Sequence, residues 1–434
     1  MIGAQDNKTP KRKITIEDIN KLRFLEAEKM IPDDHKIPFI KRIFYKYLSL
    51  RLYKYSNIFN SKIIKNIRIF NNSNKKQVSE LNNLNNIRRV LVFRYDAIGD
   101  YFVTTPVLRW LKENIPNIII DIVTSNRNNA IISQDIFINK TFIVDEKSNY
   151  AKISRDSIKK IKKNKYDLLL SLVVNRTTRA AELATLAAPE AYKVAIGNRE
   201  IYKQIFDLLV PRQHWISHAS VQFYETLLKC FPNKCDISNL EPYIPVGEKY
   251  FKEAMKFAQD NNLIFNPKLD VFQEKYNFEK SDGYKYIIIN INSSIEQRAI
   301  PAEKVIEIVK ILKEKYPNYV YLITGDPKKK HIIQKVVSDI NIENCKSLML
   351  SFNAFSVIVA GASLLISPDT ATIHVAAFAE VPIVALYFVY YAIFEWYPLS
   401  KNFTIFHADE SGYPGADLIA EEASRYLELN LASS

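Results

Sequence analysis

Two short segments of this 434-residue sequence combine acidic residues with the expected start of a helix. The first is R-Y-D-A-I-G-D, residues 94–100, which carries two carboxylates and follows a short apolar run. Asp100 would fall in the first turn of the next helix. A carboxylate there is a candidate general base that removes a proton from an attacking hydroxyl. The alternative is that Asp100 only caps the helix, a common role worth ~1 kcal/mol.

The second segment is P-D-T-A-T-I-H, residues 368–374, which also follows an apolar run. A helix that begins at Asp369 or Thr370 would present free N–H groups to an anion such as a diphosphate. The small side chain of Ala371 would let the anion approach the backbone. His374 lies one turn after Thr370 on the same face, so it is either a hydrogen-bond donor to a phosphate or a buried core histidine.

Two further loops could contribute to phosphate or nucleotide binding. The sequence S-S-I-E-Q-R, residues 293–298, offers the hydroxyls of Ser293 and Ser294 and the guanidinium of Arg298. An ordinary surface loop would have the same composition. The turn T-G-D-P, residues 324–327, contains Gly325 and is a weaker candidate by itself.

Apolar runs alternate with helix-spaced segments twice along the chain, which predicts an α/β fold with two doubly wound, Rossmann-like domains facing a cleft. Expected strands are 90–93, 118–123, 143–144, 168–173, 286–290, 319–323, 364–367 and 383–387. Expected helices are 101–114, 302–316, 327–339, 370–379 and about 416–429. In such sheets, ligands bind beyond the carboxyl ends of the strands, where all four candidate segments lie.

The predicted organisation has four parts. These are an N-terminal extension (1–86), a first Rossmann-like domain (87–265), a second one (266–410) and a C-terminal helix (411–434). The apolar run 374–394 is long enough to span a bilayer, but it contains Glu380 and Pro382. We therefore expect a short helix, a turn and a buried strand there.

The positive charge of the chain is concentrated in the extension. The formal net charge is +13, and no acidic residue occurs between Asp34 and Glu80. The basic residues of this interval are Lys36, Lys41, Arg42, Lys46, Arg51, Lys54, Lys62, Lys65, Arg68, Lys75 and Lys76. Apolar residues between Ile40 and Leu52 fall on one face of a helix.

A basic amphipathic helix of this kind is typical of a segment that lies on an anionic membrane surface. We therefore expect residues 36–76 to contact a membrane. The alternatives are a helix packed on the protein and a nucleic-acid contact. The rest of the chain has no basic stripe or binding motif, so no nucleic-acid partner is expected.

The sequence lacks several motifs that would indicate other kinds of site or a secretory signal. The chain has 9 glycines, and neither G-x-G-x-x-G nor G-x-x-x-x-G-K-[ST] occurs, so a site built on a glycine-rich loop is not expected. Cys230, Cys235 and Cys345 lack metal-ligand spacing, which favours free thiols. The N-terminus has no apolar segment typical of a secretory signal.

Two motifs together resemble glycosyltransferase family 9, the bacterial heptosyltransferases. L-V-F-R-Y-D-A-I-G-D-Y-F-V-T-T-P-V-L-R-W-L-K (91–112) resembles the opening signature of the family. L-L-I-S-P-D-T-A-T-I-H-V-A-A-F-A-E-V-P-I-V-A-L-Y (364–387) resembles the second signature. The resemblance runs from about Arg88 to the C-terminus and does not include residues 1–86.

The resemblance implies a GT-B fold, with the acceptor in the first Rossmann-like domain and the nucleotide sugar in the second. It also implies inverting, metal-independent transfer from a nucleotide-activated heptose such as ADP-heptose. Asp100 matches the catalytic base of the family. The family's phosphate ligands fall on Ser293, Ser294, Arg298, Asp369, Thr370, Ala371 and His374.

The sequence departs from the family pattern at three places. Ala371 stands where the family commonly has glycine, and the loop 388–392 (F-V-Y-Y-A) replaces a G-P-T-D-P loop near the sugar. Lys329, after the turn that contains Gly325, replaces an acidic ribose contact. A cation cannot accept a hydrogen bond from a ribose hydroxyl, so nucleotides other than ADP stay open.

The acceptor expected from this resemblance is a membrane-held glycolipid such as lipopolysaccharide core, which would place the protein at the inner face of the cytoplasmic membrane. The alternatives are a different nucleotide sugar, a protein or capsular glycan acceptor, and a non-catalytic scaffold of the same fold.

Overall fold

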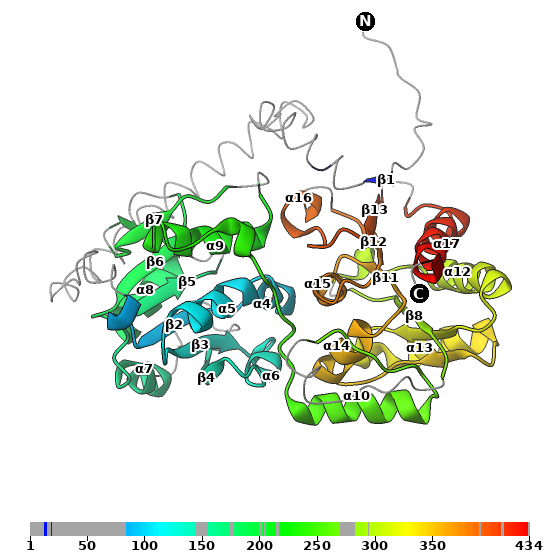
Figure 1. Ribbon diagram of the computed structural model, residues 1–434, viewed down its shortest axis with the longest axis horizontal. Helices are drawn as coiled ribbons and strands as arrows, with labels where there is room; N and C mark the ends of the chain where they lie inside the picture. Colours follow the sequence, from blue (N-terminus) through cyan, green and yellow to red (C-terminus); the bar gives the residue numbers. More distant parts are fainter. Residues whose placement is uncertain are drawn as a thin grey trace, which may run out of the picture. The chain divides into compact units, whose positions relative to one another are not determined.

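The computed structural model describes most of the chain after residue 83 and a few residues before it (Figure 1). The described residues are 13–14, 19, 84–144, 155–173, 177–198, 202–203, 205–213, 217–269, 283–293, 295–389, 392–408 and 412–432. The chain divides into two compact units. The N-terminal unit comprises Leu22–Glu241, and the C-terminal unit comprises Pro242–Ser434 together with Met1–Lys21.

The N-terminal unit is built on a six-stranded parallel sheet with the order β4-β3-β2-β5-β6-β7. Its strands are β2 (Arg89–Phe93), β3 (Ile119–Ser125), β4 (Ile138–Val144), β5 (Leu168–Ser171), β6 (Tyr192–Ile196) and β7 (Leu208–Val210). The central strands β2 and β5 are mostly apolar because helices cover both faces of a parallel sheet. The strand order reverses between β2 and β5, which is where doubly wound sheets bind ligands.

The helices of this unit are α4 (Ile98–Phe102), α5 (Thr105–Asn114), α6 (Asn129–Ile132), α7 (Arg155–Lys162), α8 (Thr177–Ala187) and α9 (Ala219–Cys230). The single helix expected over 101–114 is thus two helices. Pro106 is in the first turn of α5, where its missing N–H costs no helical hydrogen bond. The break between the helices is closed by the Thr104 hydroxyl, which donates to the Asp100 carbonyl at 2.8 Å.

The C-terminal unit contains a seven-stranded sheet with the order β1-β13-β12-β11-β8-β9-β10. The strands are β1 (Lys13–Ile14), β8 (Tyr286–Asn290), β9 (Val320–Thr324), β10 (Cys345–Ser347), β11 (Leu364–Pro368), β12 (Ile383–Tyr387) and β13 (Phe403–His407). All neighbours are parallel except β1, which is antiparallel to β13. The strand order reverses between β8 and β11, so the segments that follow these two strands meet at one edge.

The helices of the C-terminal unit are α10 (Glu248–Asp260), α12 (Ala302–Lys315), α13 (Lys330–Ile340), α14 (Phe352–Ala360), α15 (Ala371–Phe378), α16 (Ala392–Trp396) and α17 (Ala416–Ala432). The apolar run 374–394 forms α15, a turn in which Glu380 has a φ of 53°, and β12. Among the residues that the structure describes, no helix is long and apolar enough to cross a membrane.

Two predicted boundaries are corrected by the structure. The units divide after Glu241 rather than at residue 265, because α10 packs on α14 and Leu263 pairs with Tyr284 of the C-terminal unit. Residues 1–86 are also not one separate helical extension. Lys13 and Ile14 form a strand on the C-terminal sheet, and Ile14 is buried there. The basic segment 36–76 lies outside the described residues.

Candidate active-site residues

Asp100 lies in the first turn of α4, and one of its carboxylate oxygens caps that helix. Oδ2 accepts a hydrogen bond from the backbone N–H of Ala97, the N-cap residue, at 2.9 Å. Asp100 therefore has the helix-capping role that the sequence left open as an alternative. The side chain is still 18% exposed, so it can also meet a ligand. Capping and base catalysis are compatible, because each oxygen of a carboxylate has a free lone pair after one hydrogen bond.

Arg94, the first residue after β2, has a fully buried guanidinium that contacts both carboxylates of the segment. Its Nη2 lies 3.4 Å from Oδ1 of Asp100, and its Nη1 lies 3.3 Å from Oδ2 of Asp96. Nε donates to the backbone carbonyl of Asp100 at 2.9 Å, and Nη1 also donates to the carbonyl of Leu172, just after β5. The sequence did not single out Arg94, because Leu172 is brought to it only by the pairing of β2 with β5.

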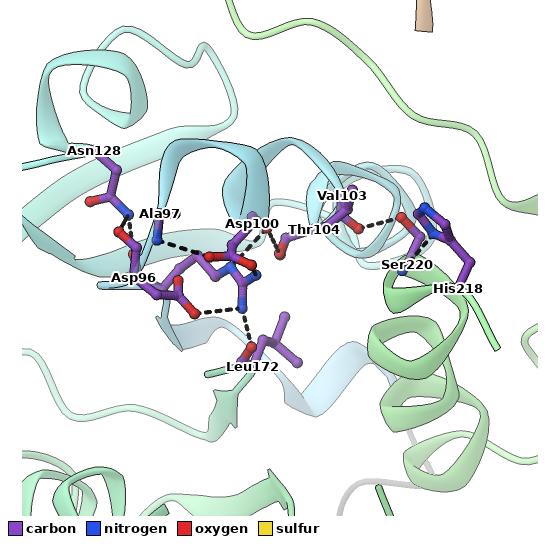
Figure 2. A network of polar contacts seen from close by, with 10 residues as sticks. Asp96, Ala97, Asp100, Val103, Thr104, Asn128, Leu172, His218 and Ser220 are labelled. Atoms are coloured by element: carbon purple, nitrogen blue, oxygen red, sulfur yellow. Dashed lines mark hydrogen bonds and ion pairs between the residues drawn. The ribbon is translucent and has the colours of Figure 1, made fainter. Parts of the chain in front are cut away.

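Buried side chains from α6 and α9 hold the surroundings of this segment (Figure 2). Asn128 donates from Nδ2 to the carbonyl of Arg94 at 2.8 Å and to that of Asp96 at 3.3 Å. On α9, Ser220 donates to the carbonyl of Val103 at 2.7 Å, which anchors the break between α4 and α5. The segment 94–104 is thus fixed to three neighbouring elements.

In the C-terminal unit, Arg298 and Asp369 form an ion pair at the ends of β8 and β11. Nη1 of Arg298 lies 3.3 Å from Oδ2 of Asp369, and both side chains are mostly buried. Burial raises the pKa of Asp369 to about 6, although the cation of Arg298 opposes this shift. The hydroxyl of Tyr413 donates to the Arg298 carbonyl at 2.7 Å and so fixes the backbone of the loop.

The N-terminus of α15 is positioned by a buried asparagine at the end of β8. Asn290 donates from Nδ2 to the hydroxyls of Ser367 at 3.1 Å and Thr370 at 3.2 Å. Thr370 is the N-cap residue of α15, with extended backbone, and its side chain makes no capping hydrogen bond. The first N–H groups of α15, which begin with that of Ala371, are thus oriented for an anion. Asn290 was not singled out from the sequence, where its signal is a polar residue at the end of an apolar strand.

His374 lies in the interior, one turn into α15. It is 3% exposed, and its ring meets the edge of Trp396 with centroids 6.3 Å apart. Burial lowers the pKa of the imidazole to about 4. At neutral pH His374 is therefore uncharged and adds no positive charge to the anion site.

The remaining candidates lie on two neighbouring loops. Ser293 accepts a hydrogen bond from the N–H of Ile295 at 3.4 Å, and Ser294 lies outside the described residues. Lys329 contacts the exposed carboxylate of Glu296, two residues before Arg298, at 3.3 Å. Gly325 packs so closely on Asn292 that a Cβ would lie 2.2 Å from its Oδ1. Of these candidates, Lys329 is the one cation, and it is paired with Glu296.

The structure thus brings Arg298, Asp369, Thr370 and Ala371 together, and His374 packs behind them. A cation and the N-terminus of a helix are suited to bind a diphosphate. In the other unit, Asp100 provides a fixed, partly exposed carboxylate.

Comparison with known proteins identifies the family of the chain. The model of the family described as glycosyltransferase family 9 (heptosyltransferase) matches residues 155–418, more than half of the sequence. The chain belongs to glycosyltransferase family 9. The matched span contains the Arg298 and Asp369 site and does not contain Asp100.

Individual relatives agree with this family. The chain is 23% identical over 320 residues to lipopolysaccharide heptosyltransferase 3 of Escherichia coli K12, a match that covers 71% of this chain and 85% of the relative. A family 9 glycosyl transferase from Veillonella parvula has a similar structure, with a TM-score of 0.62, 20% identity and coverage of 80% and 98%. E. coli heptosyltransferase WaaC, solved with ADP, gives a TM-score of 0.59, 16% identity and coverage of 78% and 99%.

The two sheets of this chain match those of GT-B glycosyltransferases in these solved structures, which confirms the predicted fold. The protein is a glycosyltransferase of the heptosyltransferase type.

Proposed function

We propose that this glycosyltransferase moves heptose from ADP-heptose to a hydroxyl of a lipopolysaccharide-core type glycolipid, with inversion and without a metal ion. The observation that carries the proposal is the Arg298–Asp369 pair beside the N-terminus of α15. This arrangement offers a diphosphate both a cation and backbone N–H donors. The names of two relatives support the sugar, the nucleotide and the acceptor: lipopolysaccharide heptosyltransferase 3, and heptosyltransferase WaaC solved with ADP.

In the proposed reaction, Asp100 accepts the proton of the acceptor hydroxyl. The hydroxyl oxygen forms a bond to the anomeric carbon of the donor, and the bond from that carbon to the diphosphate oxygen breaks on the opposite face. The negative charge that develops on the nucleoside diphosphate is stabilised by Arg298 and the N–H groups of α15. These groups supply positive charge at the position where other phosphate sites use a metal ion.

The base assignment is tested by Asp100→Asn. We expect turnover of ADP-heptose with a core oligosaccharide acceptor to fall about 10²- to 10⁴-fold, the usual contribution of a general base. The dissociation constant of the donor should stay within about twofold of the wild-type value, since the proposed donor ligands are in the other unit. Glu113→Gln, an exposed carboxylate on α5, is the matched control. Turnover equal to that of the control would remove Asp100 from the mechanism.

The donor is tested by thermal shift with ADP, UDP, GDP, CDP and CMP, each with and without magnesium. A nucleotide at 100 times its dissociation constant should add about 2.7 kcal/mol of stability. We expect ADP to stabilise the protein most and magnesium to have no effect. A larger response to UDP or GDP would keep the reaction class and change the sugar nucleotide, the alternative that Lys329 favours. No response to any nucleotide would favour the non-catalytic scaffold.

Peripheral membrane association at the inner face of the cytoplasmic membrane is the second part of the proposal. Its support is the sequence of residues 36–76, which has eleven basic residues and no acidic one. The test replaces these eleven residues with glutamine in the full chain, so that Lys13 and Ile14 stay in place. We expect wild-type protein, and not the variant, to float with vesicles that contain anionic lipid, while ADP binding is unchanged. Equal flotation of both proteins would refute this part.

A further inference from the structure

The guanidinium of Arg94 is enclosed by oxygen atoms: Nε and Nη1 donate hydrogen bonds to backbone carbonyls, and Nη2 and Nη1 form ion pairs with two carboxylates. The side chain is fully buried, and its nitrogens face two carboxylates and two backbone carbonyls, which belong to Asp96, Asp100 and Leu172. The ring of Phe223 on α9 covers one face of the guanidinium, with its centroid 4.4 Å from Cζ. A buried cation is expensive unless it is paired and hydrogen-bonded. These contacts hold the guanidinium between Asp96, Asp100 and Leu172.

The partners of Arg94 come from both sides of the switch point of the sheet. Arg94 itself follows β2, and Leu172 follows β5. The carboxylate and the carbonyl of Asp100 are both bound by the same side chain, the carboxylate through Nη2 and the carbonyl through Nε. The second carboxylate oxygen of Asp100 is held by the Ala97 N–H. Both oxygens of Asp100 therefore have a fixed neighbour, which defines the plane of the carboxylate.

We propose that Arg94 is a positioning residue that sets the orientation of the Asp100 carboxylate for proton removal, an inference that rests on the proposed role of Asp100. Arg94 acts through Asp100 and touches neither donor nor acceptor, because it has no exposed surface. A lysine cannot replace it, since an ammonium lacks the planar fork that reaches the carboxylate, the carbonyl of Asp100 and the carbonyl of Leu172 together. A displaced catalytic group loses rate even when its chemical identity is kept.

A double-mutant cycle between Arg94→Met and Asp100→Asn tests this proposal. With ADP-heptose and a core oligosaccharide, we expect Arg94→Met to lower kcat about 100-fold in the wild-type background, the scale of a misplaced catalytic group. In the Asp100→Asn background the same substitution should change kcat less than about threefold. Equal losses in both backgrounds would mean that Arg94 does not act through Asp100, and would overturn the proposal.

Two further variants separate positioning from a general structural role. Arg109→Met removes a guanidinium from the same unit, on α5, where it lies 3.3 Å from the exposed Glu241. We expect this control to leave kcat unchanged. Arg94→Lys keeps the charge and serves if the methionine variant does not fold. Its kcat should lie between that of the wild type and that of Arg94→Met. If Arg94→Met does not fold, Arg94→Lys should lower kcat well below the wild-type value in the wild-type background and should not do so in the Asp100→Asn background.

Amide hydrogen exchange tests the inference without any substrate. In Arg94→Lys, exchange of the Ala97 amide should become at least about tenfold faster, because its acceptor is no longer held, while exchange in β8 stays the same. An unchanged Ala97 amide would refute the positioning role. A wrong donor assignment would give a different result. The wild-type protein would then show no turnover of ADP-heptose, while exchange of the Ala97 amide would still be faster in Arg94→Lys.

Discussion

Nη1 of Arg298 lies 3.3 Å from Oδ2 of Asp369, so the main cation of the proposed diphosphate site is already paired with an anion. The pair joins the loop after β8 to the loop after β11, directly before the N-cap of α15. A diphosphate that binds there competes with Asp369 for Arg298. In the proposed function, the carboxylate would therefore hold the guanidinium in place until a diphosphate binds.

Removal of the Arg298 charge should weaken donor binding more than it lowers stability. A hydrogen bond to a charged group contributes about 1.5–3 kcal/mol, so Arg298→Gln should raise the dissociation constant of ADP about 10- to 100-fold. Arg298→Lys should recover part of this loss, since the charge remains but the fork does not. Calorimetric titration measures both variants, and Lys328→Gln, on the loop after β9, is the control. Affinity of Arg298→Gln equal to that of the control would place the diphosphate elsewhere.

Burial of His374 makes the stability of the protein sensitive to acid. The pKa of the folded imidazole is about 4, below its ordinary value of 6.5, so only the unfolded chain takes up this proton between these values. The stabilisation by the neutral ring is complete above pH 6.5 and decreases as the pH falls to 4, by about 3 kcal/mol. His374→Gln should therefore lose less stability than wild type over this interval. Parallel curves of unfolding free energy against pH would show that His374 is not buried as described.

Much of the fold could be predicted from the sequence, because apolar runs in an α/β chain indicate buried parallel strands. The strands at 90–93, 286–290 and 383–387 are found within a residue of their expected ends. Five of the strands that the structure describes were missed: β1, β6, β7, β10 and β13. β6 has the sequence Y-K-V-A-I, and its Lys193 is buried only because its Nζ donates to the carbonyls of Pro189 and Ala191. In the sequence, such a lysine indicates a solvent-exposed position and not a buried strand.

The candidate site was predictable in part for a related reason. Residues at the turn from a buried strand to the next helix, such as Asp100 and Asp369, can be selected from the order of elements alone. Their partners cannot, since Arg94 meets Leu172 and Asn290 meets Thr370 only when distant strands pair. For His374 the sequence left two interpretations open. The structure buries it, a fact that depends on Trp396 of another helix.

Close packing of the loop after β9 explains the glycine at position 325. In Gly325→Ala, the new Cβ would lie 2.2 Å from Oδ1 and 2.9 Å from Cγ of Asn292, so the asparagine must move. We expect a loss of about 1–3 kcal/mol in the free energy of unfolding, as for other overpacked sites. Asn292→Ala in the same chain should restore most of it. Chemical denaturation of the two single variants and the double variant measures this coupling, and strictly additive losses would contradict the packing argument.

The strand β1 makes the N-terminal end of the chain a part of the C-terminal unit. Ile14 is 5% exposed and pairs with Ile405, and Lys13 forms an ion pair with the mostly buried Glu422 of α17. Glu422 also accepts a hydrogen bond from the Thr404 hydroxyl at 2.6 Å, so Lys13 joins a polar cluster that ties β13 to α17. Loss of this strand should expose β13 as an edge.

We therefore expect Ile14→Ala to lower the free energy of unfolding of the C-terminal unit by about 2 kcal/mol, toward the low end for buried isoleucine because the strand lies at the edge of the sheet. Leu429→Ala on α17, where the leucine is 55% exposed, is the matched control and should change stability by less than about 0.5 kcal/mol. Thermal unfolding measures both, and amide exchange at β13 shows where the change occurs. Equal stability of the two variants would mean that β1 does not hold the sheet. Faster exchange confined to β13 in Ile14→Ala would show that a segment at the start of the chain stabilises the unit that carries Arg298 and Asp369.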